Sequence, residues 1–221
     1  MNERINEIAK VATKLFIQQG YAKTQIGHIA KEVGVSVGTI YLDFTGKREI
    51  LHFIFKTLIQ PRFREQEFKR PITDALFTDI ENEVIVSLEE MRERFAAPLK
   101  NGLNGYSFER LMSDAFDLMS DYAAGCLIIE KNAFEFKRLA EHYRAYRNSF
   151  FETMKKYLNE FARLQQIRAL PYPELTATLI IETLSWWAMD IRFSTFETQN
   201  IATELAKKVC LDNLVSAYSL S

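Results

Sequence analysis

The sequence predicts an all-α fold of about nine helices, because apolar residues recur every three to four positions along most of the chain. The 221 residues include only 8 Gly and 5 Pro, so turns are scarce and long helices are favoured over many short strands. Hydrophobic residues make up 48% and charged residues 26%, which is usual for a soluble protein with a substantial core.

Two short helices are predicted at the start of the chain. Apolar residues at helical spacing over residues 5–16 mark the first, and Gly20 favours a left-handed cap at its C-terminal end. Thr24 is expected to cap the second helix, because its hydroxyl can accept from a backbone N–H. Gly34 is expected to end that helix.

A third and a fourth helix follow directly. Ser36 is expected to cap the third, which runs over residues 37–42. The fourth starts near residues 45–47. Pro61 is expected to stop or kink it, because proline lacks the backbone N–H that a helix interior needs.

Five longer helices are predicted in the remainder. Helical periodicity covers residues 72–95, 107–129, 134–166, 174–193 and 199–218. Pro98 is expected to close the first of these, and residues 100–106, with Gly102 and Gly105, are expected to form a loop. Pro171 and Pro173 mark a further boundary.

The distribution of charge and apolar residues favours a cytoplasmic protein without membrane contact. Residues 1–20 spread their positive charges among apolar residues at helical spacing, which is typical of a structural helix and not of a secretory signal. The apolar stretch 175–193 contains Glu182, Asp190 and Arg192, which argues against a membrane span. Residues 1–60 carry more basic than acidic side chains, and the rest of the chain carries more acidic ones. This distribution suits an N-terminal region that binds phosphate groups.

Residues 24–47 have the pattern of a helix-turn-helix. Ala30 is small enough for two helices to cross closely, and Gly34 can supply the turn conformation. The second helix of such a motif lies in the major groove of DNA, with its N-terminal residues near the base edges. The expected DNA-contacting residues are Thr24, Ser36, Val37, Gly38, Thr39, Tyr41 and Lys47.

This region resembles the tetracycline-repressor (TetR/AcrR) family. The matching features are A-x-x-L-F-x-x-x-G-Y at residues 12–21, Thr24 with Ile29-Ala30, G-V-S-x-G-T-I-Y at residues 34–41, and F-x-x-K-x-x-I-L at residues 44–51. They cover the first quarter of the chain. Two positions depart from the common family pattern, namely Val37, where a basic or amide residue is frequent, and Leu42-Asp43, where an aromatic residue or histidine often precedes the phenylalanine.

The resemblance implies a helix-turn-helix DNA-binding domain at residues 1–48 and a helical ligand-binding and dimerisation domain at residues 49–221. It also implies a repressor that binds a palindromic double-stranded DNA operator as a homodimer and is released by a small, largely apolar effector. An apolar Val37 suits contact with a thymine methyl group. Asp43 is expected either to accept from a cytosine amine or to be solvated.

The helix predicted near residues 174–193 is apolar around most of its circumference, so it should be buried on two sides. A domain core can cover one side and a partner subunit the other, and two helices from each subunit would form a four-helix bundle. The expected dimer-interface residues are Leu179, Trp186, Ile201, Leu205 and Val209. A central core helix of a monomer remains an alternative interpretation of this pattern.

An effector pocket is harder to locate from sequence. Its candidate lining residues are Phe95, Tyr106, Phe108, Met112, Phe116, Met119, Tyr122, Phe150 and Trp187. Aromatic and Met residues at helical spacing are also typical of an ordinary core.

The sequence bears differently on two other classes of function, an enzyme and a regulator of another kind. The histidines His28, His52 and His142 lie in separate segments, and the chain has no nucleophile elbow, phosphate-binding glycine loop or HExxH motif, so no enzyme activity, metal or cofactor is expected. Cys126 and Cys210 lie far apart and fit neither a disulfide framework nor a metal site. A protein of the same fold that acts as an activator or through a protein partner is not separated from a repressor by sequence alone.

Overall fold

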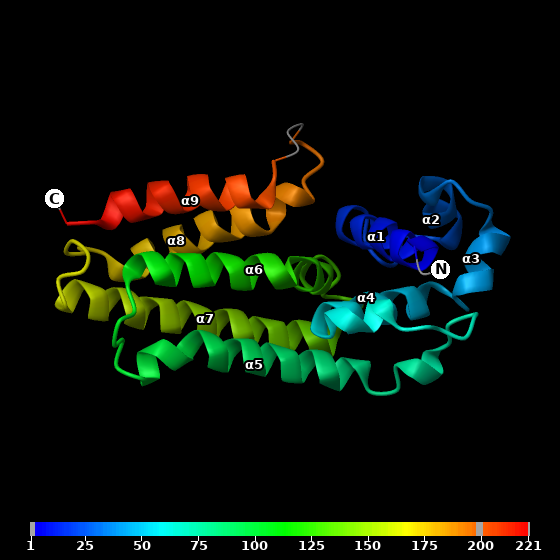
Figure 1. Ribbon diagram of the computed structural model, residues 1–221, viewed down its shortest axis with the longest axis horizontal. Helices are drawn as coiled ribbons and strands as arrows, with labels where there is room; N and C mark the ends of the chain where they lie inside the picture. Colours follow the sequence, from blue (N-terminus) through cyan, green and yellow to red (C-terminus); the bar gives the residue numbers. More distant parts are fainter. Residues whose placement is uncertain (1–2, 198–200, 221) are drawn as a thin grey trace. The chain divides into compact units, whose positions relative to one another are not determined.

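The computed structural model describes residues 3–197 and 201–220. Within these ranges it contains nine α-helices and three short 3-10 helices (Figure 1). The backbone bridge between Phe44 and Ile72 is isolated, so the described residues form no sheet. The prediction of an all-α fold of about nine helices is confirmed.

The N-terminal helices are α1 (Glu3–Gln18), α2 (Ile26–Val33), α3 (Val37–Asp43) and α4 (Lys47–Ile59). Two 3-10 helices follow, η1 (Pro61–Glu65) and η2 (Asp74–Leu76). The longer helices are α5 (Ile80–Lys100), α6 (Phe108–Lys131), α7 (Lys137–Arg163) and α8 (Pro173–Ala188). The chain then forms η3 (Asp190–Arg192) and α9 (Thr203–Tyr218).

The chain divides into two compact units. Unit 1 comprises residues 1–87 and 124–143, and unit 2 comprises residues 88–123 and 144–221. Helices α5, α6 and α7 therefore each contribute residues to both units. The boundary after residue 48 was predicted between a DNA-binding and a ligand-binding domain, and this functional division stays a prediction.

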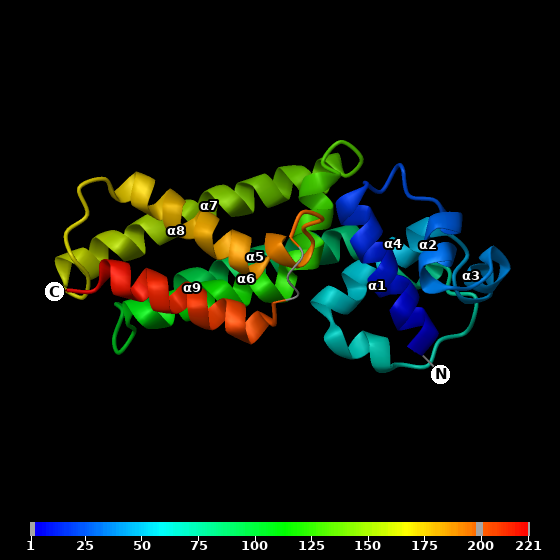
Figure 2. The ribbon, with the colours of Figure 1, turned by 90° about the horizontal axis from the view of Figure 1, so that it is seen from above.

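The core of unit 1 lies where α1 packs against α2 and α4 (Figure 2). The apolar face predicted for the first helix is fully buried, with Ile5, Ile8, Ala12 and Phe16 all at 0% exposure. Because these residues are three or four positions apart, they form one continuous stripe on α1. This stripe gives the helix-turn-helix a rigid support.

In unit 2, α8 lies beside α9, as Figures 1 and 2 both show. Each of these two helices buries one regular row of side chains. The rows are Ala177, Ile180, Leu184 and Ala188 on α8, and Ala206, Cys210, Leu214 and Tyr218 on α9. Elsewhere in the unit, Phe95 of α5 stacks on Phe150 of α7 with ring centroids 4.0 Å apart.

The predicted bounds of α5 were wrong at both ends. Residues 72–79 are not part of the helix, because the Ile72 N–H donates to the Asp43 carbonyl at 2.8 Å and holds this segment against the end of α3. At the other end α5 continues through Pro98 to Lys100. A proline in the last turn removes only one of the final helical hydrogen bonds, so it does not end the helix.

The last two predicted helices also differ from the structure. The segment predicted as helix over residues 174–193 leaves the α-helix at Ala188 and passes into η3. The last helix begins at Thr203, and the predicted start at Gln199 lies outside the described residues.

Candidate nucleic-acid interface

The turn between α2 and α3 has the geometry that the sequence predicted. Gly34 adopts a left-handed conformation with φ 80° and ψ 31°, which glycine reaches without steric cost. Its N–H donates to the Ala30 carbonyl at 3.0 Å and to the Lys31 carbonyl at 3.2 Å, so it closes the end of α2. Ala30 is buried, as expected for the residue at the helix crossing.

Ser36 begins α3 as its N-cap. Its hydroxyl oxygen accepts from the Thr39 backbone N–H at 3.1 Å, which confirms the predicted cap. The Ser36 and Thr39 hydroxyl groups lie 2.9 Å apart and form a hydrogen bond. Ile40 is buried beneath them, and this fixes which face of α3 points outward.

The predicted cap of α2 was wrong by one residue, because the N-cap is Gln25 and not Thr24. Thr24 is fully buried, and its hydroxyl donates to the Gly20 carbonyl at 2.8 Å. The hydroxyl also accepts from the Gln19 side-chain amide at 3.1 Å. Gly20 has a φ of 93°, so the chain reverses sharply here, and Thr24 stabilises that reversal.

Lys47 lies at the start of α4 and fastens the same reversal. Its Nζ donates to the Tyr21 carbonyl at 2.6 Å and to the Thr24 carbonyl at 2.9 Å. The ammonium also lies 4.2 Å from the centroid of the Tyr21 ring, a favourable cation–π geometry. Burial lowers the pKa of Lys47 because desolvation disfavours its charged form.

Asp43, the last residue of α3, is neither solvated nor available to bases. It is fully buried and forms ion pairs with Arg4 at 2.5 Å and with Arg70 at 2.7 Å. Both expectations for Asp43 were therefore wrong. A buried carboxylate needs paired cations, and here these come from α1 and from the segment before Ile72.

The remaining predicted residues of α3 share its outer face. Val37, Gly38 and Tyr41 are exposed with Ser36, and Thr39 is half-exposed beside them. The structure therefore brings together five of the seven predicted contact residues on α3 and its cap, whereas Thr24 and Lys47 stabilise the reversal between α1 and α2.

Four exposed residues in this part of unit 1 were not among the DNA-contacting residues predicted from the sequence. Leu42 is exposed on α3, and the cations Lys23, Lys31 and Arg48 are exposed on the neighbouring segments. The signal for Leu42 was present, because it lies four residues after Gly38 and so on the same side of the helix. The cations stand among many other lysines and arginines, and the sequence does not single them out.

Asn132, just after α6, fixes the end of α1 from within unit 1. Its Nδ2 donates to the carbonyls of Phe16 at 3.0 Å and Ile128 at 2.8 Å. Its Oδ1 accepts from the Tyr21 N–H at 2.6 Å. The side chain is buried, so these bonds hold the loop after α1 without competition from water.

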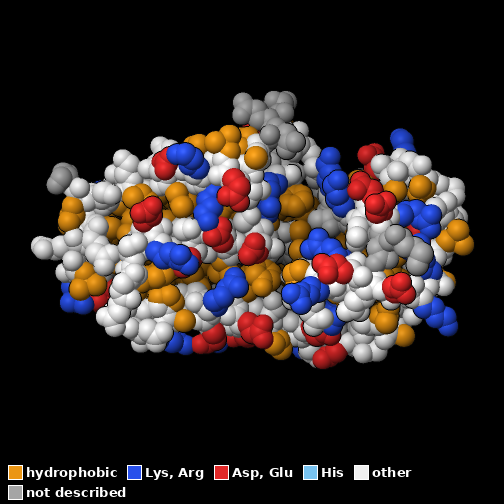
Figure 3. Space-filling model, viewed as in Figure 1, with side chains coloured by type: hydrophobic (Ala, Val, Ile, Leu, Met, Phe, Trp, Pro, Cys, Tyr) orange, Lys and Arg blue, Asp and Glu red, His pale blue; other side chains and the backbone are white. Residues whose placement is uncertain are grey.

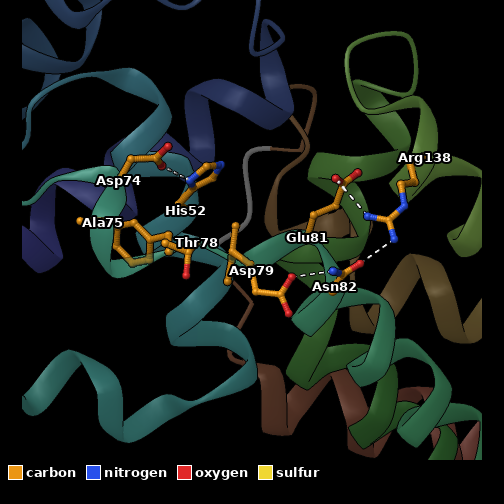
Figure 4. Close-up of a pocket in the computed structure, with 10 residues that line it drawn as sticks. His52, Asp74, Ala75, Thr78, Asp79, Glu81, Asn82 and Arg138 are labelled. Carbon is orange, nitrogen blue, oxygen red and sulfur yellow. Dashed lines mark hydrogen bonds and ion pairs between the residues drawn. The ribbon is translucent and has the colours of Figure 1, made fainter.

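Unit 1 also contains a polar cavity of about 630 Å³ (Figure 4). At one side, Asp74 binds His52 at 2.7 Å and Arg48 at 2.5 Å. At the other, Arg138 contacts Glu81 at 3.2 Å and Asn82 at 2.5 Å. None of the predicted pocket residues lines this cavity.

A second cavity, of about 330 Å³, lies in unit 2 and contains two of the predicted pocket residues, Phe95 and Tyr106. Its walls are more polar than expected and include Arg94, Arg110, Asp114, Asp117 and Asp121. The Tyr106 hydroxyl donates to Asp114 at 3.0 Å, and burial together with this carboxylate raises the pKa of the phenol.

The other predicted pocket residues do not line either cavity. Phe108, Met112, Phe116 and Phe150 are buried, and Met119, Tyr122 and Trp187 are partly exposed. Within the described ranges no group of His, Cys, Asp and Glu side chains has the arrangement of a metal site. None of the helices in those ranges combines the length and the hydropathy that crossing a membrane requires.

Comparison with known proteins identifies the N-terminal region as similar to bacterial regulatory proteins. Residues 8–54 match the family described as "Bacterial regulatory proteins, tetR family". The HTH-type transcriptional regulator HbdR of Aromatoleum sp. (strain CIB) is 43% identical over 72 residues, which are 33% of this chain and 31% of HbdR. The fatty acid metabolism regulator protein of Bacillus subtilis (strain 168) is 42% identical over 50 residues, 23% of this chain and 26% of that protein.

Two solved structures resemble the whole chain. The ketosteroid transcriptional regulator KstR2 of Mycobacterium tuberculosis covers 100% of this chain and 97% of its own, with a TM-score of 0.52 and 14% identity. The probable transcriptional regulatory protein RHA5900 covers 98% and 100%, with a TM-score of 0.51 and 15% identity. At these identities the likeness shows the fold.

The fold and the α2–α3 geometry together define a helix-turn-helix protein. Its residues 8–54 have the N-terminal sequence of the family of bacterial regulatory proteins named after TetR. Its matched segments span a third or less of the curated relatives, namely 31% of HbdR and 26% of the fatty acid metabolism regulator.

Proposed function

We propose that this protein is a transcriptional repressor that binds a palindromic operator as a homodimer and is released by a small-molecule effector. The observation that carries the proposal is the outer face of α3. Ser36 caps this helix, Asp43 anchors its end in the protein, and the face between them is exposed. A short helix fixed at both ends and open on one side is what major-groove binding requires. Two of the regulators named above are 43% and 42% identical to this chain over 72 and 50 residues.

The DNA contacts divide into two kinds. Val37, Gly38 and Tyr41 on α3 would face the base edges. The hydroxyls of Ser36 and Thr39 and the exposed cations Lys23, Lys31 and Arg48 would contact phosphates on either side. Such phosphate contacts release counterions, so binding should weaken steeply as salt rises. Binding to chromosomal DNA would place the protein in the cytoplasm.

The proposed dimer forms through α8 and α9. Leu175, Leu179 and Trp186 are exposed on the side of α8 that lies opposite its buried row. Leu205 and Val209 are exposed on α9. Such an apolar surface is unfavourable in water, and a twofold axis can bury it against the same surface of a second subunit. Ile201, half-exposed just before α9, completes the predicted interface.

The proposed effector site is in unit 2, at the cavity beside Phe95 and Tyr106. The aromatic rings suit a largely apolar ligand, and the Asp114 carboxylate with the Tyr106 hydroxyl offers it a polar end. The effector must bind the DNA-incompetent state better than the competent one, because equal affinity would shift no population. The remaining predicted pocket residues would surround this site from the core.

Selection of bound sequences from random duplex DNA by the full chain tests the proposal. Enrichment of an inverted repeat, whose half-sites are about one helical turn apart, is the expected result. Recovery of no enriched sequence by protein that is folded and dimeric would contradict the proposal. It would favour a protein of the same fold that acts through a protein partner.

A further inference from the structure

The outer face of α3 is apolar and carries no charge. Val37, Tyr41 and Leu42 are 43%, 49% and 65% exposed, which is high for side chains of these types. Val37 and Tyr41 lie one helical turn apart, as do Gly38 and Leu42, so the four residues form two adjacent rows. Hydrophobic side-chain atoms are visible at the surface in the region of α3, at the right-hand end of Figure 3.

The polar groups of α3 and its cap have little hydrogen-bonding capacity for base edges. Asp43, its only charged residue, is fully buried between Arg4 and Arg70. The Ser36 hydroxyl accepts from the Thr39 N–H and is hydrogen-bonded to the Thr39 hydroxyl. The helix contains no Arg, Lys, Asn, Gln or Glu, the residue types that make bidentate or strong hydrogen bonds to base edges. Direct hydrogen-bonded reading of bases by α3 is therefore limited mainly to the Tyr41 hydroxyl.

We propose that Val37 and Leu42 determine specificity by contacting the C5-methyl groups of thymines in each half-site. This inference rests on the proposed function, namely that α3 enters the major groove. The thymine methyl is the only alkyl group that the major-groove edges of the four standard bases present. An apolar side chain placed against a base N–H or carbonyl would exclude water and leave that group without a hydrogen bond. Thymine is therefore the base that this face of α3 accommodates at least cost.

Gly38 lies between the two apolar residues and contributes no side chain. A Cβ at this position would lie 3.6 Å from the Ser36 hydroxyl oxygen, which is ordinary van der Waals contact. The protein itself therefore has room for alanine here. The absence of a side chain instead allows the helix backbone to approach the DNA closely, which brings Val37 and Leu42 within reach of the methyl groups.

The test uses the inverted repeat selected from random DNA and replaces each thymine in turn by deoxyuridine, which removes only the methyl group. For the wild-type protein, replacement at the contacted positions should weaken binding about fourfold per methyl group, from the free energy of burying one methyl. The Val37→Ala and Leu42→Ala variants should each lose the sensitivity at the position that the deleted side chain contacts. Leu164→Ala, which truncates an exposed leucine in unit 2, is the matched control and should retain it.

The outcomes separate the two proposals. Tight, sequence-selective binding that no uracil substitution changes would overturn the thymine assignment and leave the regulator proposal standing. Sensitivity that persists unchanged in both alanine variants would also overturn it, because the methyl groups would then act through DNA shape. Failure of the wild-type protein to bind any selected duplex would contradict the proposed function itself.

Discussion

The Asp43 carboxylate at the end of α3 binds the Arg4 guanidinium of α1 through two contacts, Oδ2 to Nε at 2.5 Å and Oδ1 to Nη2 at 3.0 Å. The two residues are 39 positions apart in the chain. Asp43 is fully buried, whereas the Arg4 side chain is 42% exposed. The pair therefore joins α3 to α1, and the hydrogen bond to Asp43 raises the pKa of Arg4.

Replacement of Asp43 by asparagine should destabilise the protein by about 2 kcal/mol or more, because Arg4 and Arg70 would lose the charge that they share. The loss should be smaller than for a fully buried ion pair because both arginines are partly exposed. Urea unfolding followed by circular dichroism measures the change. We also expect weaker operator binding, since the end of α3 would be released.

Asp212→Asn is the control for this change. Asp212 and Lys208 form an exposed pair on α9 at 2.9 Å, and such pairs contribute well under about 1 kcal/mol. Equal free energies of unfolding for the two variants would show that the Asp43 cluster does not stabilise the helix-turn-helix.

Replacement of Asn132 by alanine should lower the free energy of unfolding by about 2–3 kcal/mol. The change leaves the Phe16 carbonyl and the Tyr21 N–H without their partner in a buried environment, where unpaired polar groups are costly. Denaturant unfolding provides the measurement. Asn213→Ala removes a similar bond, 2.8 Å to the Val209 carbonyl, but at an exposed site. If Asn213→Ala lowers the free energy of unfolding as much as Asn132→Ala does, burial of the Asn132 amide does not account for its contribution to stability.

Replacement of Leu179 by glutamate should convert the proposed dimer to a monomer. Leu179 is 60% exposed on the outer side of α8, and a carboxylate there would have to be desolvated in the interface. Sedimentation velocity over a concentration series would detect the change. Val86→Glu on α5 is the matched control, since Val86 is 55% exposed and lies outside the proposed interface. A dimer that survives Leu179→Glu would place the interface elsewhere.

Cys210 should make stability depend on alkaline pH. Burial raises the pKa of its thiol to about 11, above the ordinary value of 9.0, because the thiolate is disfavoured in the core. The contribution of the buried thiol to the free energy of unfolding is therefore fully present below pH 9. It is lost as pH rises from 9 towards 11, at up to about 1.4 kcal/mol per pH unit. Other groups also titrate in this range.

The measurement is consequently the difference between wild type and Cys210→Ala in unfolding free energy across this range. A constant difference would contradict the assignment. The same burial predicts that Cys210 resists alkylation at pH 8 until denaturant is added. Mass spectrometry of the treated protein gives that second readout.

Local features of the fold and site could be predicted from sequence. Ser36 and Gly34 act on residues within four positions of themselves, so their roles as cap and turn follow from residue type and spacing. The buried stripe of α1 follows from periodicity in the same way. The outer sides of α8 and α9 are exposed in the single chain, so the predicted burial of α8 on two sides stays a prediction.

Long-range partners could not be predicted in this way. The ion pairing of the buried Asp43 depends on Arg4 and Arg70, which are 39 and 27 residues away in the chain. The late start of α5 depends on the hydrogen bond between Ile72 and Asp43. Asn132 contacts residues more than a hundred positions earlier, at separations of 111 and 116. No local pattern encodes these contacts, because each forms only after separate helices have packed together.

The most direct test of the central claim is the affinity of the full chain for the selected inverted repeat, compared with a scrambled duplex of the same composition, over a salt series. We predict that the repeat binds much more tightly than the scrambled duplex. The logarithm of its binding constant should also fall linearly with the logarithm of the salt concentration, because phosphate contacts by both subunits of the proposed dimer release counterions. Equal affinity for the two duplexes, measured with folded dimeric protein, would contradict the assignment of α3 as a DNA-reading helix.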